Sequence, residues 1–355
     1  METGIIGLPL AGKTTIFNAL TSQQAHLSSA AGVKKQTNLA DVQVPDIRVE
    51  KLAAIFNPKK KVHATVLFKD VQTEITTSGG LAPSTLGEIR SSDALTVIVR
   101  AFEAEAVYHP FDKIDPAADL KRILDSLVFS DYEIIAKRLE RLDKEAKRGS
   151  REFQVLEKLS KRLEEGSLIG VDFMAPEESS LTAGFSFLTA KPVIVVANIG
   201  ADTDEEKDPG LKNLRMEAAR LGLDLFAIRG DQEMEIAQLS EEDQQEFLAD
   251  LGLSEPARNR FIQHIYTSLD LISFLTVGED EVRAWSIPRD TVAVKAAGKI
   301  HSDLEKGFIR AEVIHNEELL ALGGLGPARK QGKLRLEGKN YVVQDGDVLT
   351  IRFNV

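Results

Sequence analysis

Short apolar runs that could form buried strands alternate with helical patterns along the first 272 residues. The predicted strands are residues 3–6, 63–70, 94–102, 185–188, 192–198 and 224–228. Between them lie stretches with apolar residues three and four positions apart, such as residues 15–20 and 211–221. Strands that alternate with helices in this way predict an α/β fold with a doubly wound, mostly parallel sheet.

Residues 115–166 have a different pattern, with apolar side chains at helical spacing over two long stretches. Asp115-Pro116 is a typical helix start, because an acidic residue caps the helix and proline fits its first turn. Gly149-Ser150 interrupts the pattern, which then resumes. Opposite charges four residues apart, such as Glu140 and Lys144, stabilise a helix. We predict two antiparallel helices, inserted as a hairpin into the sheet domain.

The pattern changes again after residue 272, where short strands follow one another. The predicted strands are residues 275–277, 282–287, 311–314, 341–343 and 348–353. Helical patterns at residues 292–300 and 317–322 accompany them, and Asp345-Gly346 predicts a hairpin turn between the last two strands. The sequence therefore predicts a small α+β module with its boundary near residue 272.

The first predicted strand and helix are joined by Gly-Leu-Pro-Leu-Ala-Gly-Lys-Thr, which matches the phosphate-loop motif Gly-x-x-x-x-Gly-Lys-[Ser/Thr]. Glycines let the backbone approach a polyphosphate, and successive N–H groups form a positive nest at a helix N-terminus. The candidate ligand-binding residues are Gly7, Leu8, Pro9, Leu10, Ala11, Gly12, Lys13, Thr14 and Thr15. A glycine-rich turn that binds nothing is the alternative, but the strand–loop–helix context favours a nucleotide site.

Three side chains supply the candidate chemistry. Lys13 would reach the β- and γ-phosphates and is the candidate catalytic residue, and the Thr14 hydroxyl would hold Mg²⁺. Asp70 ends the strand at residues 63–70, where phosphate-loop enzymes carry the carboxylate on the Mg²⁺ side. Acidic residues also end strands without any function, but the loop upstream favours a metal site at Thr14 and Asp70.

Composition and charge exclude several classes of protein. The chain has 355 residues, of which 43% are hydrophobic and 28% charged, as in ordinary globular proteins. It has no cysteine, which excludes disulfides, thiolate metal sites and cysteine nucleophiles. The net charge of −11 argues against a broad nonspecific nucleic-acid surface, and no DNA partner is expected. We expect no membrane span and no signal peptide, and therefore a cytoplasmic protein.

Several stretches of the chain resemble the YchF proteins, the Obg-like ATPases. They are residues 7–20, residues 44–48 (Val-Pro-Asp-x-Arg), residues 282–288 (Val-Arg-Ala-Trp-Ser-Ile-Pro) and residues 297–311 (Ala-Gly-Lys-Ile-His-Ser-Asp-Leu-Glu-Lys-Gly-Phe-Ile-Arg-Ala). The resemblance implies three domains: a nucleotide-binding G domain at residues 1–114 and 167–272, a helical hairpin at 115–166, and a TGS domain of β-grasp fold at 273–355. It also implies ATP hydrolysis and association with the ribosome or another RNA-containing translation complex.

The chain differs from the family pattern near the predicted γ-phosphate. The Asp-x-x-Gly motif is Asp70-Val71-Gln72-Thr73, and threonine tolerates unusual backbone angles less well than glycine. The glycine-rich second switch is Gly79-Gly80-Leu81-Ala82-Pro83. No threonine is clearly in place to hold Mg²⁺ from the first switch, although Lys34 and Thr37 lie nearby. These differences predict slow hydrolysis.

The base-recognition motif also differs, because Asn-x-x-Glu is Asn198-Ile199-Gly200-Ala201. Asn198 and Ile199 are the candidate base contacts. Ala201 cannot accept a hydrogen bond from guanine, so we expect ATP to bind at least as well as GTP. The alternative is a one-residue shift of the loop that brings Asp202 into the vacant place.

Two functions fit these observations. The first is a slow Mg²⁺-dependent NTPase that acts as a ribosome-associated switch, and the second is a nucleotide-gated binding protein or adaptor with little hydrolysis. A metal hydrolase is a distant third, because the six histidines lack ligand spacing. His301 lies in the most family-like stretch without an assignable role. The lysines at residues 59–61 could contact RNA, although such clusters are usually only solvated.

Overall fold

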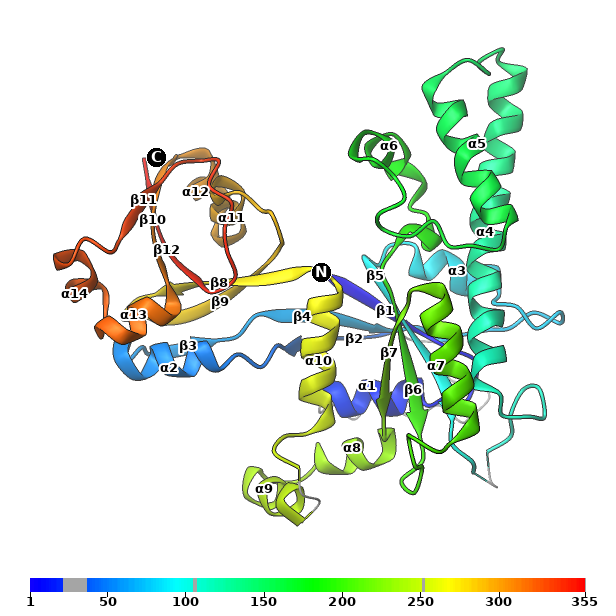
Figure 1. Cartoon of the computed structure of the whole chain (residues 1–355), viewed down its shortest axis with the longest axis horizontal. Helices are drawn as coiled ribbons and strands as arrows, with labels where there is room; N and C mark the ends of the chain where they lie inside the picture. Colours follow the sequence, from blue (N-terminus) through cyan, green and yellow to red (C-terminus); the bar gives the residue numbers. More distant parts are fainter. Residues whose placement is uncertain (22–36, 105–106, 251–252, 355) are drawn as a thin grey trace. The chain divides into compact units, whose positions relative to one another are not determined.

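The computed structural model (Figure 1) divides the chain into two compact units. It describes four stretches of the chain, residues 1–21, 37–104, 107–250 and 253–354. The first unit comprises residues 1–41 and 67–258, and the second comprises residues 42–66 and 259–355. The predicted nucleotide-binding domain included residues 42–66 and 259–272, and both segments lie in the second unit.

The first unit is built on a six-stranded sheet. In spatial order its strands are β2 (Asn38–Gln43), β4 (Thr65–Asp70), β1 (Glu2–Ile6), β5 (Ala94–Ala101), β6 (Val193–Ile199) and β7 (Asp224–Ile228). Four of the five neighbouring pairs, from β4 through β7, are parallel. Every residue of β6 is buried, as expected of a central parallel strand covered on both faces. The predicted mostly parallel sheet is confirmed.

Helices cover both faces of this sheet. Val195, Ala197 and Ile199 of β6 share an apolar core with the helices α4 and α7. Successive side chains of a strand point to opposite faces, so the equally buried Ile194 and Val196 lie on the other side. The helices of this unit are α1 (Lys13–Thr21), α3 (Pro83–Ile89), α4 (Pro116–Lys144), α5 (Arg151–Glu164), α6 (Pro176–Thr182), α7 (Pro209–Leu221), α8 (Gly230–Ile236) and α9 (Glu241–Asp250).

The predicted helical hairpin is formed by α4 and α5. Asp115 caps α4 by accepting a hydrogen bond from the Ala118 N–H (3.1 Å), and Ser150 caps α5 by accepting one from the Phe153 N–H (3.2 Å). Their facing apolar side chains form a core of their own. Residues 185–188 are not the predicted strand, because short 3-10 turns, η1 (Ala183–Phe185) and η2 (Leu188–Ala190), occupy that region. Among the described residues, no helix is both long enough and apolar enough to cross a membrane.

The second unit contains a second six-stranded sheet. In spatial order its strands are β11 (Arg335–Glu337), β10 (Phe308–His315), β12 (Asp347–Phe353), β8 (Leu271–Val277), β9 (Glu281–Pro288) and β3 (Lys60–Val62). Its helices are α2 (Ile47–Phe56), α11 (Ala293–Ile300), α12 (Ser302–Lys306), α13 (Asn316–Leu322) and α14 (Leu325–Lys330), and α10 (Ala257–Ser268) joins the two units. Because β3 pairs in parallel with β9, residues 42–66 belong to this unit.

Two predictions for the second unit are wrong. Residues 341–343 form only an isolated bridge between Val342 and Val292, and β11 is the strand that was missed. Asp345-Gly346 does not close a hairpin, because β12 pairs antiparallel with β10 and parallel with β8. Arg48, which lies in one of the stretches that resemble the YchF family, contacts this turn: its guanidinium donates to the Asp345 carboxylate at 2.7 Å. The predicted second sheet module is confirmed, and its β-grasp or TGS classification stays a prediction.

Candidate functional site

The phosphate-loop segment lies between the end of β1 and the start of α1, as the sequence predicts. Two of its glycines are required by close approaches. A Cβ atom on Gly7 would lie 2.2 Å from the Ile98 backbone oxygen, and one on Gly12 would lie 2.1 Å from the Asn198 side-chain nitrogen. Gly12 also has a φ of 87°, which L-residues rarely adopt. The loop therefore depends on glycine at both ends of the motif.

Lys13 folds its side chain back over this loop. Its Nζ donates to the backbone oxygens of Gly7 (3.1 Å) and Leu8 (3.0 Å). Burial of the ammonium lowers the pKa of Lys13 to about 8, and the nearby Asp70 carboxylate acts in the opposite direction. A cation held over this loop, at the N-terminus of α1, is an arrangement suited to a polyphosphate.

The two predicted metal ligands lie together. The Thr14 hydroxyl donates to Asp70 Oδ2 at 3.1 Å, and Asp70 is buried. Hydroxyl and carboxylate oxygens are the hard ligands that Mg²⁺ prefers, so the residues present fit this ion. Asn38 also donates to Asp70 Oδ2, at 3.3 Å. The sequence analysis missed Asn38, because it predicted no strand at Asn38–Gln43.

The two other residues that the sequence placed near the Mg²⁺ site, Thr37 and Lys34, do not contact Asp70 or lie outside the described residues. Thr37 donates to the Glu88 carboxylate and not to Asp70. Lys34 lies outside the described residues. Within the described stretches, no group of three or more His, Cys, Asp or Glu side chains is placed to hold a metal ion. Thr14 and Asp70 thus remain the metal ligands that we propose.

The predicted base contacts, Asn198 and Ile199, end β6 beside the loop. The Asn198 amide donates to the Ala11 oxygen (3.2 Å) and accepts from the Gly230 N–H (3.1 Å). It therefore links the phosphate loop to the segment after β7. The Ile199 side chain is in the apolar core of the first unit. Direct contact of either residue with a base stays a prediction.

Arg229 fixes the loop that follows β6 and was not found from the sequence. Its guanidinium donates to the backbone oxygens of Ala201 (3.2 Å) and Thr203 (3.0 Å) and to the Glu205 carboxylate (3.2 Å). Asp202 in the same loop is exposed. The only sequence signal for Arg229 is its position directly after a predicted strand.

The described histidines with assigned contacts have structural roles. His109 is buried, and its Nε2 lies 2.9 Å from Asp119 Oδ2. His301 caps α12 by accepting a hydrogen bond from the Asp303 N–H at 3.2 Å. Both histidines thus have hydrogen-bond partners within the protein, in agreement with the interpretation that they are satisfied.

Comparison with known proteins gives matches along the whole chain. Two family models match: YchF-GTPase_C, described as a protein of unknown function (DUF933), over residues 271–354, and MMR_HSR1, described as a 50S ribosome-binding GTPase, over residues 2–127. The Ribosome-binding ATPase YchF of Bacillus subtilis (strain 168) is 39% identical, with 100% of both chains covered. The protein of that name from Escherichia coli O157:H7 is 37% identical, with 100% of this chain and 99% of the relative covered.

Solved structures agree with these relatives. The Schizosaccharomyces pombe YchF GTPase has a TM-score of 0.87 and 30% identity, with 99% of this chain and 97% of that chain covered. A GTP binding protein from Pyrococcus horikoshii OT3 has a TM-score of 0.60 at 18% identity, which supports the fold alone. The predicted phosphate-loop α/β fold class is confirmed.

Proposed function

This chain belongs to the YchF family, and we propose that it binds a Mg²⁺-complexed nucleoside triphosphate at residues 7–15 and hydrolyses it slowly. The observation that carries this proposal is the arrangement of the phosphate loop. Lys13 is enclosed by the loop backbone, and Thr14 and Asp70 lie within hydrogen-bond distance of each other. A cation and two oxygen ligands at one helix N-terminus are what a triphosphate with its metal ion requires.

In this proposal each side chain has a defined role. The ammonium of Lys13 moves from the Gly7 and Leu8 oxygens to the phosphates, where it stabilises negative charge on the transferring phosphoryl group. Thr14 and Asp70 would hold Mg²⁺, directly or through water, and Asn38 donates a hydrogen bond that orients Asp70. The ion itself neutralises phosphate charge when bound. Asn198 keeps the loop in register with the segment after β7.

Slow hydrolysis is proposed because the Asp-x-x-Gly motif lacks its glycine. In Asp70-Val71-Gln72-Thr73, the Thr73 hydroxyl is 3.5 Å from the Val71 oxygen, so the side chain turns toward its own segment. The alternative function, a nucleotide-gated adaptor with little or no hydrolysis, rests on the same feature. The slow NTPase and the adaptor both require nucleotide binding, so only the rate of hydrolysis distinguishes them.

A ribosomal partner is proposed from the names of the relatives. Charge points to the second unit for any contact with RNA, because it carries 18 Lys and Arg residues against 15 Asp and Glu residues, whereas the whole chain has a net charge of −11. Deleting residues 273–355 would cut β8 and leave β3 without its sheet. Binding is therefore best tested with the full chain. A cytoplasmic location stays a prediction.

The proposed activity is tested by single-turnover ATP hydrolysis, with and without purified ribosomes, alongside cosedimentation of the full chain. We expect slow Mg²⁺-dependent hydrolysis and cosedimentation. ATP binding without turnover in either condition would favour the adaptor. Absence of cosedimentation with every nucleotide would contradict the ribosomal partner and leave the NTPase proposal standing.

Triphosphate affinity is expected to fall as pH rises through the pKa of Lys13. Because this pKa is about 8, raising the pH from 7 to 9 converts Lys13 mainly to its neutral form and weakens binding about tenfold. The pKa of Lys13 in the folded chain lies below the ordinary lysine value of 10.5, so this group makes the free energy of unfolding increase with pH between about 8 and 10.5. Calorimetry in two buffers of different ionisation enthalpy measures the proposed proton uptake on binding near pH 8. Equal affinity at both pH values without uptake would contradict the role of Lys13.

ATP is expected to bind at least as well as GTP, with weak discrimination overall. Guanine selection needs a carboxylate that accepts from the base, and Ala201 supplies none. Arg229 holds the Ala201 backbone, which disfavours the loop shift that would bring Asp202 to the base. Side-by-side titrations of the unmodified chain and Asp202→Ala measure this. GTP binding about tenfold tighter than ATP, and lost in Asp202→Ala, would show the prediction to be wrong.

A further inference from the structure

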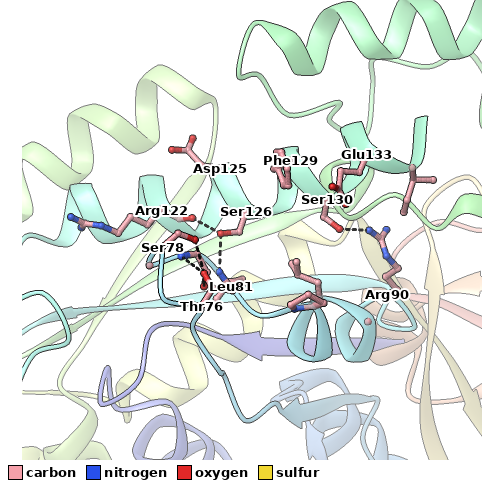
Figure 2. Close-up of a pocket in the computed structure, with 16 residues that line it drawn as sticks. Thr76, Ser78, Leu81, Arg90, Arg122, Asp125, Ser126, Phe129, Ser130 and Glu133 are labelled. Carbon is pink, nitrogen blue, oxygen red and sulfur yellow. Dashed lines mark hydrogen bonds between the residues drawn. The ribbon is translucent and has the colours of Figure 1, made fainter. Parts of the chain in front are cut away.

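The first unit has a pocket of about 560 Å³ between the second-switch segment (residues 76–81), α3 and α4 (Figure 2). Figure 2 shows Ser126, Phe129 and Glu133 along α4, with Thr76 and Leu81 on the opposite wall. This volume is within the range of pockets that bind small molecules and cofactors. Nothing in the proposed nucleotide site uses this pocket.

Gly87 is one of the residues that line the pocket. It lies within α3, where glycine is about 1 kcal/mol less favourable than alanine. A Cβ atom on Gly87 would meet no atom within 4 Å, and its φ is not in the left-handed region. Neither close packing nor backbone conformation therefore requires glycine here. A side chain at this position therefore has room beside the pocket.

The charged side chains of the lining already have partners. The ion pairs are Arg90 with Asp131 (2.9 Å), Arg122 with Asp119 (3.2 Å), Asp125 with Lys121 (2.7 Å) and Glu133 with Lys137 (3.6 Å). A charged ligand would have to compete with these pairs. Leu81 and Leu86 contribute buried apolar surface to the lining. The pocket thus favours an uncharged, apolar group.

A protein segment suits this site better than a free small molecule or RNA. Phe129 lines the pocket and is 63% exposed, so its ring offers apolar surface to a partner. Exposed aromatic side chains beside apolar pockets are typical anchors of protein–protein interfaces. The first unit carries 26 Lys and Arg residues against 40 Asp and Glu residues, an excess of negative charge that disfavours RNA.

The pocket wall is connected to the nucleotide site through the chain. The second-switch segment begins six residues after Asp70. The Leu81 N–H donates to the Ser126 hydroxyl (3.0 Å), which in turn donates to the Arg122 backbone oxygen (2.8 Å). A movement of residues 76–81 would therefore be felt at two places. It would shift the chain that leads back to Asp70, and it would alter the hydrogen bond to Ser126 on α4.

We propose that this pocket binds an apolar segment of a ribosomal protein, and that its occupancy alters triphosphate affinity through residues 76–81. The choice of a ribosomal protein and the effect on the nucleotide rest on the proposed function. The preference of the pocket for an apolar group is independent of the proposed function.

The preference is tested by disulfide exchange in the Gly87→Cys variant, which has a single thiol because the natural chain has no cysteine. Gly149→Cys is the matched control, since a Cβ atom there also meets nothing within 4 Å. Each variant is equilibrated with equal concentrations of 2-phenylethanethiol, cysteamine and 3-mercaptopropionate disulfides under partial reduction. We expect the phenylethyl adduct to be enriched about tenfold over the charged adducts in Gly87→Cys and not in Gly149→Cys. Equal ratios in the two variants would overturn the proposal.

The source of the segment is tested by attaching a benzophenone to each thiol and irradiating the labelled chain with purified ribosomes. Crosslinks to a ribosomal protein from Gly87→Cys, absent from Gly149→Cys, are expected. Cosedimentation without such crosslinks, or with crosslinks to RNA alone, would overturn the protein segment and leave the ribosomal partner intact. Lack of cosedimentation of the unlabelled chain would instead contradict the ribosomal partner itself, and with it the ribosomal source of the segment.

The coupling is measured as the affinity for ATP of the Gly87→Cys variant before and after phenylethyl modification. We expect at least a threefold change, with no change for Gly149→Cys. Unchanged affinity in a variant that shows the phenylethyl preference would overturn the coupling while the binding pocket stands.

Discussion

Replacing Lys13 with alanine is expected to weaken triphosphate binding by about ten- to a hundredfold and to leave nucleoside binding nearly unchanged. Lys13 is the only side-chain cation in the loop of residues 7–14, and a charge-assisted contact to phosphate contributes about 1.5–3 kcal/mol. Isothermal titration of ATP and of adenosine into each variant measures the two affinities separately.

Two further variants control this comparison. Lys144→Ala removes an exposed lysine, paired with Glu140 in the hairpin, and is expected to bind ATP normally. Lys13→Met keeps most of the side-chain volume, so a loss shared with Lys13→Ala assigns the effect to charge and not to a collapsed loop. If the affinity for ATP were unchanged in both Lys13 variants, the assignment of the phosphate site to residues 7–14 would be wrong.

Replacing Asp131 with alanine is expected to lower the free energy of unfolding of the first unit by about 3–5 kcal/mol. Asp131 is completely buried on α4. Its carboxylate accepts hydrogen bonds from the Thr189 N–H (2.7 Å), the Thr189 hydroxyl (2.8 Å) and the Arg90 guanidinium (2.9 Å). The substitution would leave the Arg90 charge without its partner and the buried Thr189 N–H without an acceptor.

Urea unfolding followed by circular dichroism measures this effect. Trp285, the only tryptophan, belongs to the core of the second unit, so its fluorescence reports that unit separately. Glu140→Ala is the matched control on α4, because its exposed ion pair with Lys144 contributes less than about 1 kcal/mol. An Asp131→Ala midpoint equal to that of Glu140→Ala would show that the buried network contributes little.

Local patterns in the sequence were sufficient for much of the fold. The buried strands β5 and β6 and the phosphate loop were predicted correctly. The start of α4 followed from Asp115-Pro116, because a cap is an interaction within one turn of the chain, and the break before α5 followed from Gly149-Ser150. The strand at 341–343 and the hairpin at Asp345-Gly346 were wrong for the opposite reason. An apolar run and a turn motif do not determine which strand will be the neighbour, and β12 pairs with β10 and β8.

The candidate site divides in the same way. The motif identified Lys13 and Thr14, and a strand end identified Asp70. Asn38 and Arg229 were missed because each acts on residues far away in the sequence or in a loop without a motif of its own. The Asn198 side chain was assigned to the base from its motif, and only the fold reveals its contacts with the Ala11 oxygen and the Gly230 N–H.

The sequence by itself thus determined the elements whose signals are local: strand and helix periodicity, helix caps and the phosphate-loop motif. Tertiary structure decided what depends on distant partners. It brought β3 beside β9 and so moved residues 42–66 into the second unit. It also placed Gly87 at a pocket wall formed with α4. Strand neighbours and cavities arise from contacts between residues far apart in the chain, and a single sequence carries no local signal for them.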